Sequence, residues 1–467
     1  MNIYKIIVTL ISTVSVLVTN AQSPYAHDRV YTANQISNTV SVIDPSQNKF
    51  LGEIRLGVPS PGVLSPLYRG QALVHGLRYS LQKKMLAVVS IGSNSVTLVS
   101  TETNKVLKTI YVGRSPHEPT FTPDNKQIWV SVRGEAYISV IDVDKMKEVK
   151  QVPVADGPGM VSFSPDGKTA YVCSSFTPEL DIVNTATYKI IKKIPVTSPF
   201  SPNIFTSPDG KWVALTHKDV GKVTVLNAAT LAVEKVINSG PITNHVTFSN
   251  VNNKLLMLAT IGGENKLKVY DVANNFELVN MLNVGALPHG LWSSADGKIM
   301  FVGLEYGDHV QGIDLQSMKP MSTIQIGQSP QALVYADNAV TDINNRENLS
   351  PLIDTASTQV IVLNSVIKDD MAHGRLAVRS IGLIDLVEQA FTSLKPGNSY
   401  TLALTKSEAA PFAADYEINS FITDGLGKYN GQSTGLIKSV SNTNGQVYRH
   451  VILIDDSSKQ TILSDTL

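Results

Sequence analysis

The sequence predicts an all-β protein, a seven-bladed β-propeller followed by a small β-sandwich. A unit of about forty residues recurs along most of the chain, which is the period of a propeller blade. Turn signals recur at the same place in the units, and short alternating segments rich in Val, Ile, Tyr and Thr lie between them. Four such segments per unit are typical of a blade.

One unit shows the pattern in full. It starts at Pro158, carries Phe-Ser-Pro-Asp-Gly up to Gly167, continues into an alternating strand that contains Cys173, and closes at Val196. Asp-Gly supplies the positive φ that a tight hairpin turn requires. The same phases recur over residues 75–113, 117–154, 202–237, 245–285 and 289–327.

The two ends of the repeat complement each other. Residues 30–57 supply a second, third and fourth strand without a first, and residues 331–335 supply a first strand with nothing after it. We expect them to form one composite blade, which closes a ring of seven over residues 27–335. A closed ring leaves no free sheet edge at the seam, whereas a solenoid of hairpins would need capping repeats at both ends.

These motifs carry a family resemblance. The pattern Pro-x-x-x-x-Phe-x-Pro-Asp-Gly, a Tyr-Val-like strand and then Val-x-Val-Ile-Asp resembles the YVTN-type β-propeller repeat. The resemblance implies a secreted or surface binding module of the kind common in exported and surface-layer bacterial proteins, and occasionally an enzyme or redox subunit. One scaffold hosts many unrelated sites, so it specifies the fold more than the function.

The flanking segments predict export and a second domain. Lys5 precedes the apolar run 6–19, and small residues precede a cut before Gln22, so residues 1–21 read as a signal peptide. Localisation in the periplasm, on the cell surface or in the medium is expected, with no transmembrane segment after cleavage. Residues 336–357 are polar and read as a linker. Residues 358–467 are again short and alternating, which favours a β-sandwich, although 384–394 also fits helical spacing.

Composition excludes several classes of function. Lys plus Arg equals Asp plus Glu at 39 each, so the chain lacks the excess positive charge that nucleic-acid binding needs. The sequence contains no nucleophile elbow, phosphate-binding loop, His-Glu-x-x-His or Cys-x-x-Cys motif. The single cysteine, Cys173, excludes an internal disulfide and is expected to be buried and inert. No cofactor is predicted.

One constellation of histidines stands out. His75, His117 and His289 fall at the start of the first strand of their blades, and His245 lies within about one place of that register. The first strand of a blade is the innermost, so these positions converge on the mouth of the central channel. The first interpretation is structural, hydrogen bonding between blades. The second is contact with a ligand, and the third is a divalent metal such as Cu or Zn.

The loops between second and third strands open on the same face. They carry mixed charge with Tyr and His, which is typical of a polar binding rim. With Glu118, the rim candidates are Arg133, His217, Glu305, Tyr306 and Asp308.

Two functions follow. The first is an exported, non-catalytic binding protein whose channel face holds a small molecule, a glycan or a protein, while the C-terminal domain attaches or spaces it. The alternative is a propeller enzyme, a lactonase-like hydrolase or a metal-dependent redox protein, which uses the channel histidines with Glu118, Glu305 or Asp308. Nucleic acid is not expected as a partner.

Overall fold

The computed structural model describes residues 23–57, 72–352, 358–380, 385–435, 437 and 448–466. The expected signal peptide and the end of the expected linker (353–357) lie outside these residues. Apart from one 3-10 turn, η2 (Gly262–Glu264), the regular structure in the described part consists of strands. No described helix is long and apolar enough to span a membrane.

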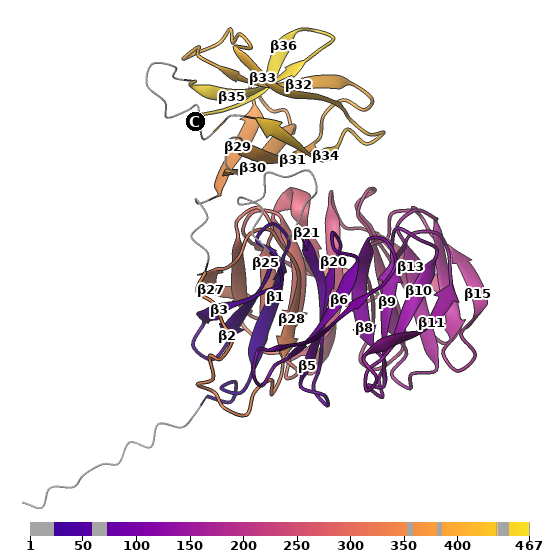
Figure 1. The fold of residues 1–467 in the computed structure, drawn as a ribbon. Helices are drawn as coiled ribbons and strands as arrows, with labels where there is room; N and C mark the ends of the chain where they lie inside the picture. The colour runs from indigo at the N-terminus through magenta and orange to yellow at the C-terminus, as the bar shows by residue number, and fades with distance from the viewer. Residues whose placement is uncertain are drawn as a thin grey trace, which may run out of the picture.

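The described residues form seven four-stranded antiparallel sheets, the blades of the predicted propeller (Figure 1). In blade order and from the inner strand outward, they are: blade 1, β28 (Pro330–Ala336), β1 (Arg29–Asn34), β2 (Thr39–Asp44), β3 (Lys49–Arg55); blade 2, β4 (Val74–Ser80), β5 (Met85–Ser90), β6 (Ser95–Ser100), β7 (Val106–Tyr111); blade 3, β8 (Pro116–Phe121), β9 (Gln127–Val132), β10 (Tyr137–Asp142), β11 (Lys147–Pro153); blade 4, β12 (Pro158–Phe163), β13 (Thr169–Ser174), β14 (Glu179–Asn184), β15 (Lys189–Pro195). The remaining three are: blade 5, β16 (Ile204–Thr206), β17 (Trp212–His217), β18 (Lys222–Asn227), β19 (Ala232–Asn238); blade 6, β20 (Thr243–Val251), β21 (Lys254–Ile261), β22 (Lys266–Asp271), β23 (Glu277–Asn283); blade 7, β24 (Pro288–Ser293), β25 (Ile299–Leu304), β26 (His309–Asp314), β27 (Lys319–Gln325).

Blade 1 is the composite blade that the sequence predicts. Strand β28 from the end of the repeat pairs with β1 from its start, with Val30 opposite Tyr335 and Tyr31 opposite Val334. The first strands contact one another in the ring order β28, β4, β8, β12, β16, β20, β24 and back to β28. The middle strands are almost completely buried and the outer strands largely exposed, so the core lies between neighbouring blades.

The segment expected to be a linker lies against the propeller for most of its length. Ser350 exchanges backbone hydrogen bonds with Glu53 of β3, and Thr341 donates to Glu102 in blade 2. Asn345 and Asn348 donate side-chain hydrogen bonds to the backbone oxygens of Glu102 and Thr103. Its polar residues therefore pair with blades 1 and 2.

The C-terminal strands form one hydrogen-bonded sheet of eight described strands, where the sequence predicts a β-sandwich. The strands, in sheet order, are β33 (Tyr416–Ile422), β32 (Ser399–Thr405), β35 (His450–Asp455), β36 (Gln460–Thr466), β29 (Gln359–Ser365), β30 (His373–Ser380), β31 (Asp385–Thr392) and β34 (Tyr429–Gly435). The sheet curls around one apolar core, and Phe421 of β33 stacks on Tyr429 of β34 at 4.0 Å, so that it closes partly on itself. The segment with helical spacing is the strand β31.

This sheet sits on one face of the propeller, over part of the ring (Figure 1). Buried Arg379 of β30 donates to Asp308 at 2.7 Å and to the backbone oxygen of Glu305, both in blade 7, and pairs with Glu388 of β31. Tyr306 is buried in an apolar cluster with residues of β30 and β31. The C-terminal domain is therefore packed against the propeller through blade 7.

Replacing Asp28 by Ala is expected to loosen the seam of the ring. The Asp28 carboxylate is buried and accepts hydrogen bonds from the Tyr335 hydroxyl (2.9 Å) and the Asn338 backbone amide (2.7 Å). Its loss leaves the buried Tyr335 hydroxyl without its acceptor and removes the bond to the partly buried Asn338 amide, at a cost of about 1–3 kcal/mol in the free energy of unfolding. Urea denaturation measures this change, and hydrogen exchange locates it at β28.

The matched control is Asp271→Ala, which removes a carboxylate that accepts two backbone hydrogen bonds in an exposed turn of blade 6. An equal loss of stability in both variants, with no faster exchange at β28, would contradict a special role for the seam.

Candidate functional site

A repeated turn sets the position of the channel residues. The residue directly before the first strand has a left-handed φ in six blades, and the positions are Leu73, Ser115, Gly157, Ile242, Leu287 and Ser329. In four cases its backbone amide donates to a side-chain oxygen from the loop between the second and third strands of the preceding blade. Those acceptors are Asn38, Asn94, Asn265 and Asp308. This bond fixes where each first strand starts, and hence which residue reaches the channel.

Four of the predicted histidines meet at the channel mouth. His75 and His117 lie with ring centroids 4.5 Å apart, and His245 and His289 lie 4.7 Å apart. The rings of His75 and His289 are separated by 6.5 Å, which joins the two pairs into one cluster. All four residues are at most 7% exposed.

The backbone of neighbouring blades orients two of these rings. Nδ1 of His117 lies 2.7 Å from the carbonyl oxygen of Gly159, and Nδ1 of His289 lies 2.7 Å from that of Gln331. A carbonyl only accepts, so Nδ1 carries the proton in both rings and Nε2 keeps its lone pair. His75 differs, because its buried Nδ1 has no hydrogen-bond partner among the described residues.

Burial keeps the imidazoles neutral. It lowers the pKa of His75 to about 3, and the positive charges of Arg133 and Lys218 act in the same direction. Burial also lowers the pKa of His117, His245 and His289 well below the usual value, and neighbouring positive groups add to the effect. Neutral imidazoles with free Nε2 atoms are the form in which histidine binds metals.

Glu118 follows His117 and takes part in a buried ion pair. Its Oε2 lies 3.4 Å from a guanidinium nitrogen of Arg78, and both side chains are buried. Burial raises the pKa of Glu118 to about 7, opposed by the charge of Arg78. The Arg78 guanidinium lies 5.3 Å from the Phe205 ring and 5.0 Å from the Trp292 ring, on blades 5 and 7. Arg78 of blade 2 therefore reaches residues of blades 3, 5 and 7. Sequence reasoning missed this residue.

His75, His117 and Glu118 each offer one ligand atom, and these atoms lie within 4.8 Å of one another. Zn–N distances near 2.1 Å place tetrahedral ligand atoms about 3.4 Å apart, so small side-chain shifts would bring these three onto one ion. Two imidazoles and one carboxylate suit Zn²⁺ or Cu²⁺. The residues present therefore fit a metal.

Of the other rim candidates, some lie at the channel mouth in the structure and others do not. Arg133 and Glu305 lie at the mouth: Arg133 stands over the rings of Phe176 and Phe200, and Glu305 lies 4.0 Å from Nε2 of His289. His217 does not reach the mouth.

His217 is completely buried inside blade 5, with its two ring nitrogens bonded to the hydroxyls of Ser201 (2.8 Å) and Thr224 (2.7 Å). Tyr306 and Asp308 are covered by the C-terminal sheet, as described above. Cys173 is buried as expected, and burial raises the pKa of its thiol to about 12.

Comparison with known proteins agrees with this architecture. The model of the YNCE-like β-propeller family matches residues 72–206, which span blades 2 to 4 and the first strand of blade 5. A search of curated proteins found no match.

Among solved structures, the chain is similar to hydrazine synthase of Kuenenia stuttgartiensis, with a TM-score of 0.51 and 20% identity over 56% of this chain and 89% of that one. It is also similar to a functionally unknown protein from Desulfotomaculum acetoxidans DSM 771, with a TM-score of 0.55 and 11% identity over 66% and 99%. A putative 6-phosphogluconolactonase from Bacteroides fragilis NCTC 9343 matches with a TM-score of 0.55 and 13% identity over 68% and 100%.

At these identities the likeness concerns the fold alone. Together with the blade repeat and the family match, it identifies the main body of this chain as a seven-bladed β-propeller of the YVTN type.

Proposed function

We propose that the chain is an exported binding protein that holds a divalent transition-metal ion at its channel mouth, with His75, His117 and Glu118 as ligands. The observation that carries the proposal is the state of His75. Its ring is buried beside two further ligand-type side chains, yet its Nδ1 has no partner among the described residues. A buried polar atom without a partner costs about 1–3 kcal/mol, and metal coordination would remove that cost.

The residues around the site support the binding of a metal ion. The bond from Nδ1 of His117 to Gly159 fixes the tautomer that presents Nε2, which is the usual second contact of a metal-bound histidine. Arg78 pairs with Glu118 and favours the ionised form of its carboxyl group, which is the form that binds metals. With three protein ligands, tetrahedral coordination leaves one position for a bound small molecule.

That position is reached from the part of the mouth that the C-terminal sheet leaves open. Figure 1 shows no strand above the blades that contain β9, β10 and β13. On this side lies a pocket of about 510 Å³, lined by Ile91, Arg114, Ser115, Arg133, Gly134, Asp156 and Phe176. Its two arginines favour a small-molecule partner with a negatively charged group.

Export is part of the proposal and rests on the first 21 residues. A positive charge, an apolar run and small residues before the cut are the pattern of a signal peptide. N-terminal sequencing of the mature protein from the producing cell tests it, with Gln22 as the expected first residue.

Metal binding is expected to saturate at one ion per chain. The full chain, freed of metal by a chelating resin, is titrated calorimetrically with ZnCl₂ and with CuCl₂. His75→Ala and Glu118→Gln each remove a ligand, and the affinity is expected to fall at least about 100-fold, since loss of an outer-shell partner alone costs 10–100-fold. His450→Ala, in the C-terminal sheet, is the control and is expected to bind as the wild type does. No saturable binding, or equal binding by His75→Ala, contradicts the proposal.

The metal-free variants are expected to separate ligand histidines from structural ones. His117→Ala removes a bond between blades 3 and 4 and is expected to lower the free energy of unfolding by about 1–3 kcal/mol. His75→Ala removes an unpaired buried polar group, so a smaller loss is expected, within about 1 kcal/mol of the wild type. Urea denaturation compares the two. Equal destabilisation by both would indicate that His75 serves the fold.

A further inference from the structure

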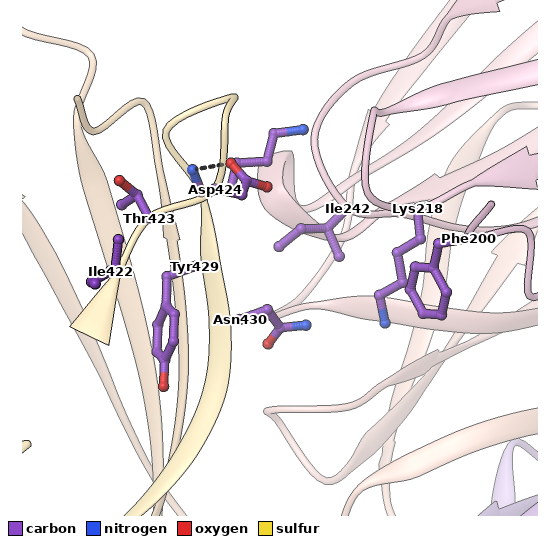
Figure 2. Close-up of a pocket in the computed structure, with 9 residues that line it drawn as sticks. Phe200, Lys218, Ile242, Ile422, Thr423, Asp424, Tyr429 and Asn430 are labelled. Atoms are coloured by element: carbon purple, nitrogen blue, oxygen red, sulfur yellow. Dashed lines mark hydrogen bonds between the residues drawn. The ribbon is translucent and has the colours of Figure 1, made fainter. Parts of the chain in front are cut away.

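A second pocket lies between the propeller and the C-terminal sheet. It measures about 360 Å³, and Figure 2 shows that its walls come from both domains. The propeller contributes Phe200, Lys218 and Ile242, and the C-terminal sheet contributes residues 422–424 and 428–430. Small-molecule sites of this size are common at domain interfaces.

Lys218 brings a positive charge to this pocket. Its ammonium group makes no hydrogen bond or ion pair with any described residue. Burial lowers its pKa, and the negative charge of Glu305 opposes the effect. Lys428 on the opposite wall is different, because its Nζ donates to the backbone oxygen of Asp219 at 3.2 Å and its charge faces those of Asp424 and Asp219.

The rest of the lining combines polar groups, Thr423, Asp424 and Asn430 among them, with apolar surface. The side-chain amide of Asn430 extends from β34 toward the propeller wall that holds Ile242 and Lys218 (Figure 2). No other described residue is hydrogen-bonded to this amide. Phe200 lies next to Lys218 in the same view and, with Ile242, gives the pocket an apolar side.

We propose that this pocket binds a small organic anion, a carboxylate with an apolar body. The carboxylate pairs with Nζ of Lys218 and accepts a hydrogen bond from the Asn430 amide, while the apolar body packs on Phe200 and Ile242. A cation and an amide donor that face each other across a cavity with an apolar wall recognise a carboxylate. Lys218 and Asn430 belong to different domains, so the ligand also stabilises the docking of the C-terminal sheet.

The inference is independent of the metal site, since none of the three proposed metal ligands lines this pocket. The test uses the full chain freed of metal, with benzoate as the probe and benzamide as its neutral counterpart. Ligands of this size bind with Kd values on the order of 1 mM, so chemical-shift titration by NMR is the suitable measurement. Benzoate is expected to bind saturably and benzamide at least about 10-fold more weakly, because loss of one charge-assisted pair costs about that much.

Variants assign the binding to the pocket. Lys218→Met keeps the length of the side chain and removes its charge, and it is expected to weaken benzoate binding at least about 10-fold. Asn430→Ala is expected to weaken it about 3- to 10-fold, the worth of one hydrogen bond. Lys211→Met, on an exposed turn of the same blade, is the control and is expected to bind as the wild type does.

Three results would overturn the inference: no saturable benzoate binding, unchanged binding by Lys218→Met, or equal binding of benzamide. His75→Ala distinguishes this failure from failure of the metal site. It is expected to retain benzoate binding while it loses zinc. If it loses benzoate binding and Lys218→Met retains it, the carboxylate binds at the channel mouth and the pocket is not its site.

Discussion

The pairing of β28 with β1 is the constraint on which the rest of the molecule depends. It joins the two ends of the repeat, and seven inner strands thereby surround one axis. Without closure, the start of blade 2 and the start of blade 7 would belong to distant parts of the chain. With it, the rings of His75 and His289 stand 6.5 Å apart. The cluster at the mouth is thus a product of ring geometry, because no single blade contributes more than one of its four histidines.

A hydrogen bond that recurs between neighbouring blades determines which residues face the channel. A side-chain oxygen in the loop after the second strand of one blade accepts a hydrogen bond from a backbone amide of the next blade. The donor is the residue with left-handed φ directly before the first strand, and the acceptors in three places are Asn38, Asn94 and Asn265. Blade 7 uses Asp308 in the same role. The substitution adds a negative charge, with which Arg379 of the C-terminal sheet pairs at 2.7 Å. One change within the repeat thus gives the second domain its docking point.

Features of the fold that repeat from blade to blade could be predicted from the sequence. The blades, the composite seam and the convergence of the histidines follow from the period and the register, which are local properties. Asp308 was expected at a binding rim, although its position in the repeat matches that of Asn265 and already indicated a structural role. Arg78 and its pairing with Glu118 were not foreseen, because the depth of a side chain in the channel depends on the strand tilt and on what the facing blades carry. The docking of the C-terminal sheet has no local signature.

Several features of the mouth are costly for folding, and they occur together. Burying the Arg78–Glu118 pair costs several kcal/mol of desolvation for each ion before attraction offsets it, and an apolar pair of similar volume would be at least as stable. Among the described residues, His75 adds a buried nitrogen without a hydrogen-bond partner, and Lys218 adds a partly buried charge without an ion pair. Elsewhere the ring is packed mainly with Val, Ile, Leu and aromatic residues, and buried polar side chains such as Asp28 and His217 are hydrogen-bonded there. Polar groups that do not serve the fold, gathered where seven strands meet and beside a domain interface, mark the region in which binding is to be sought.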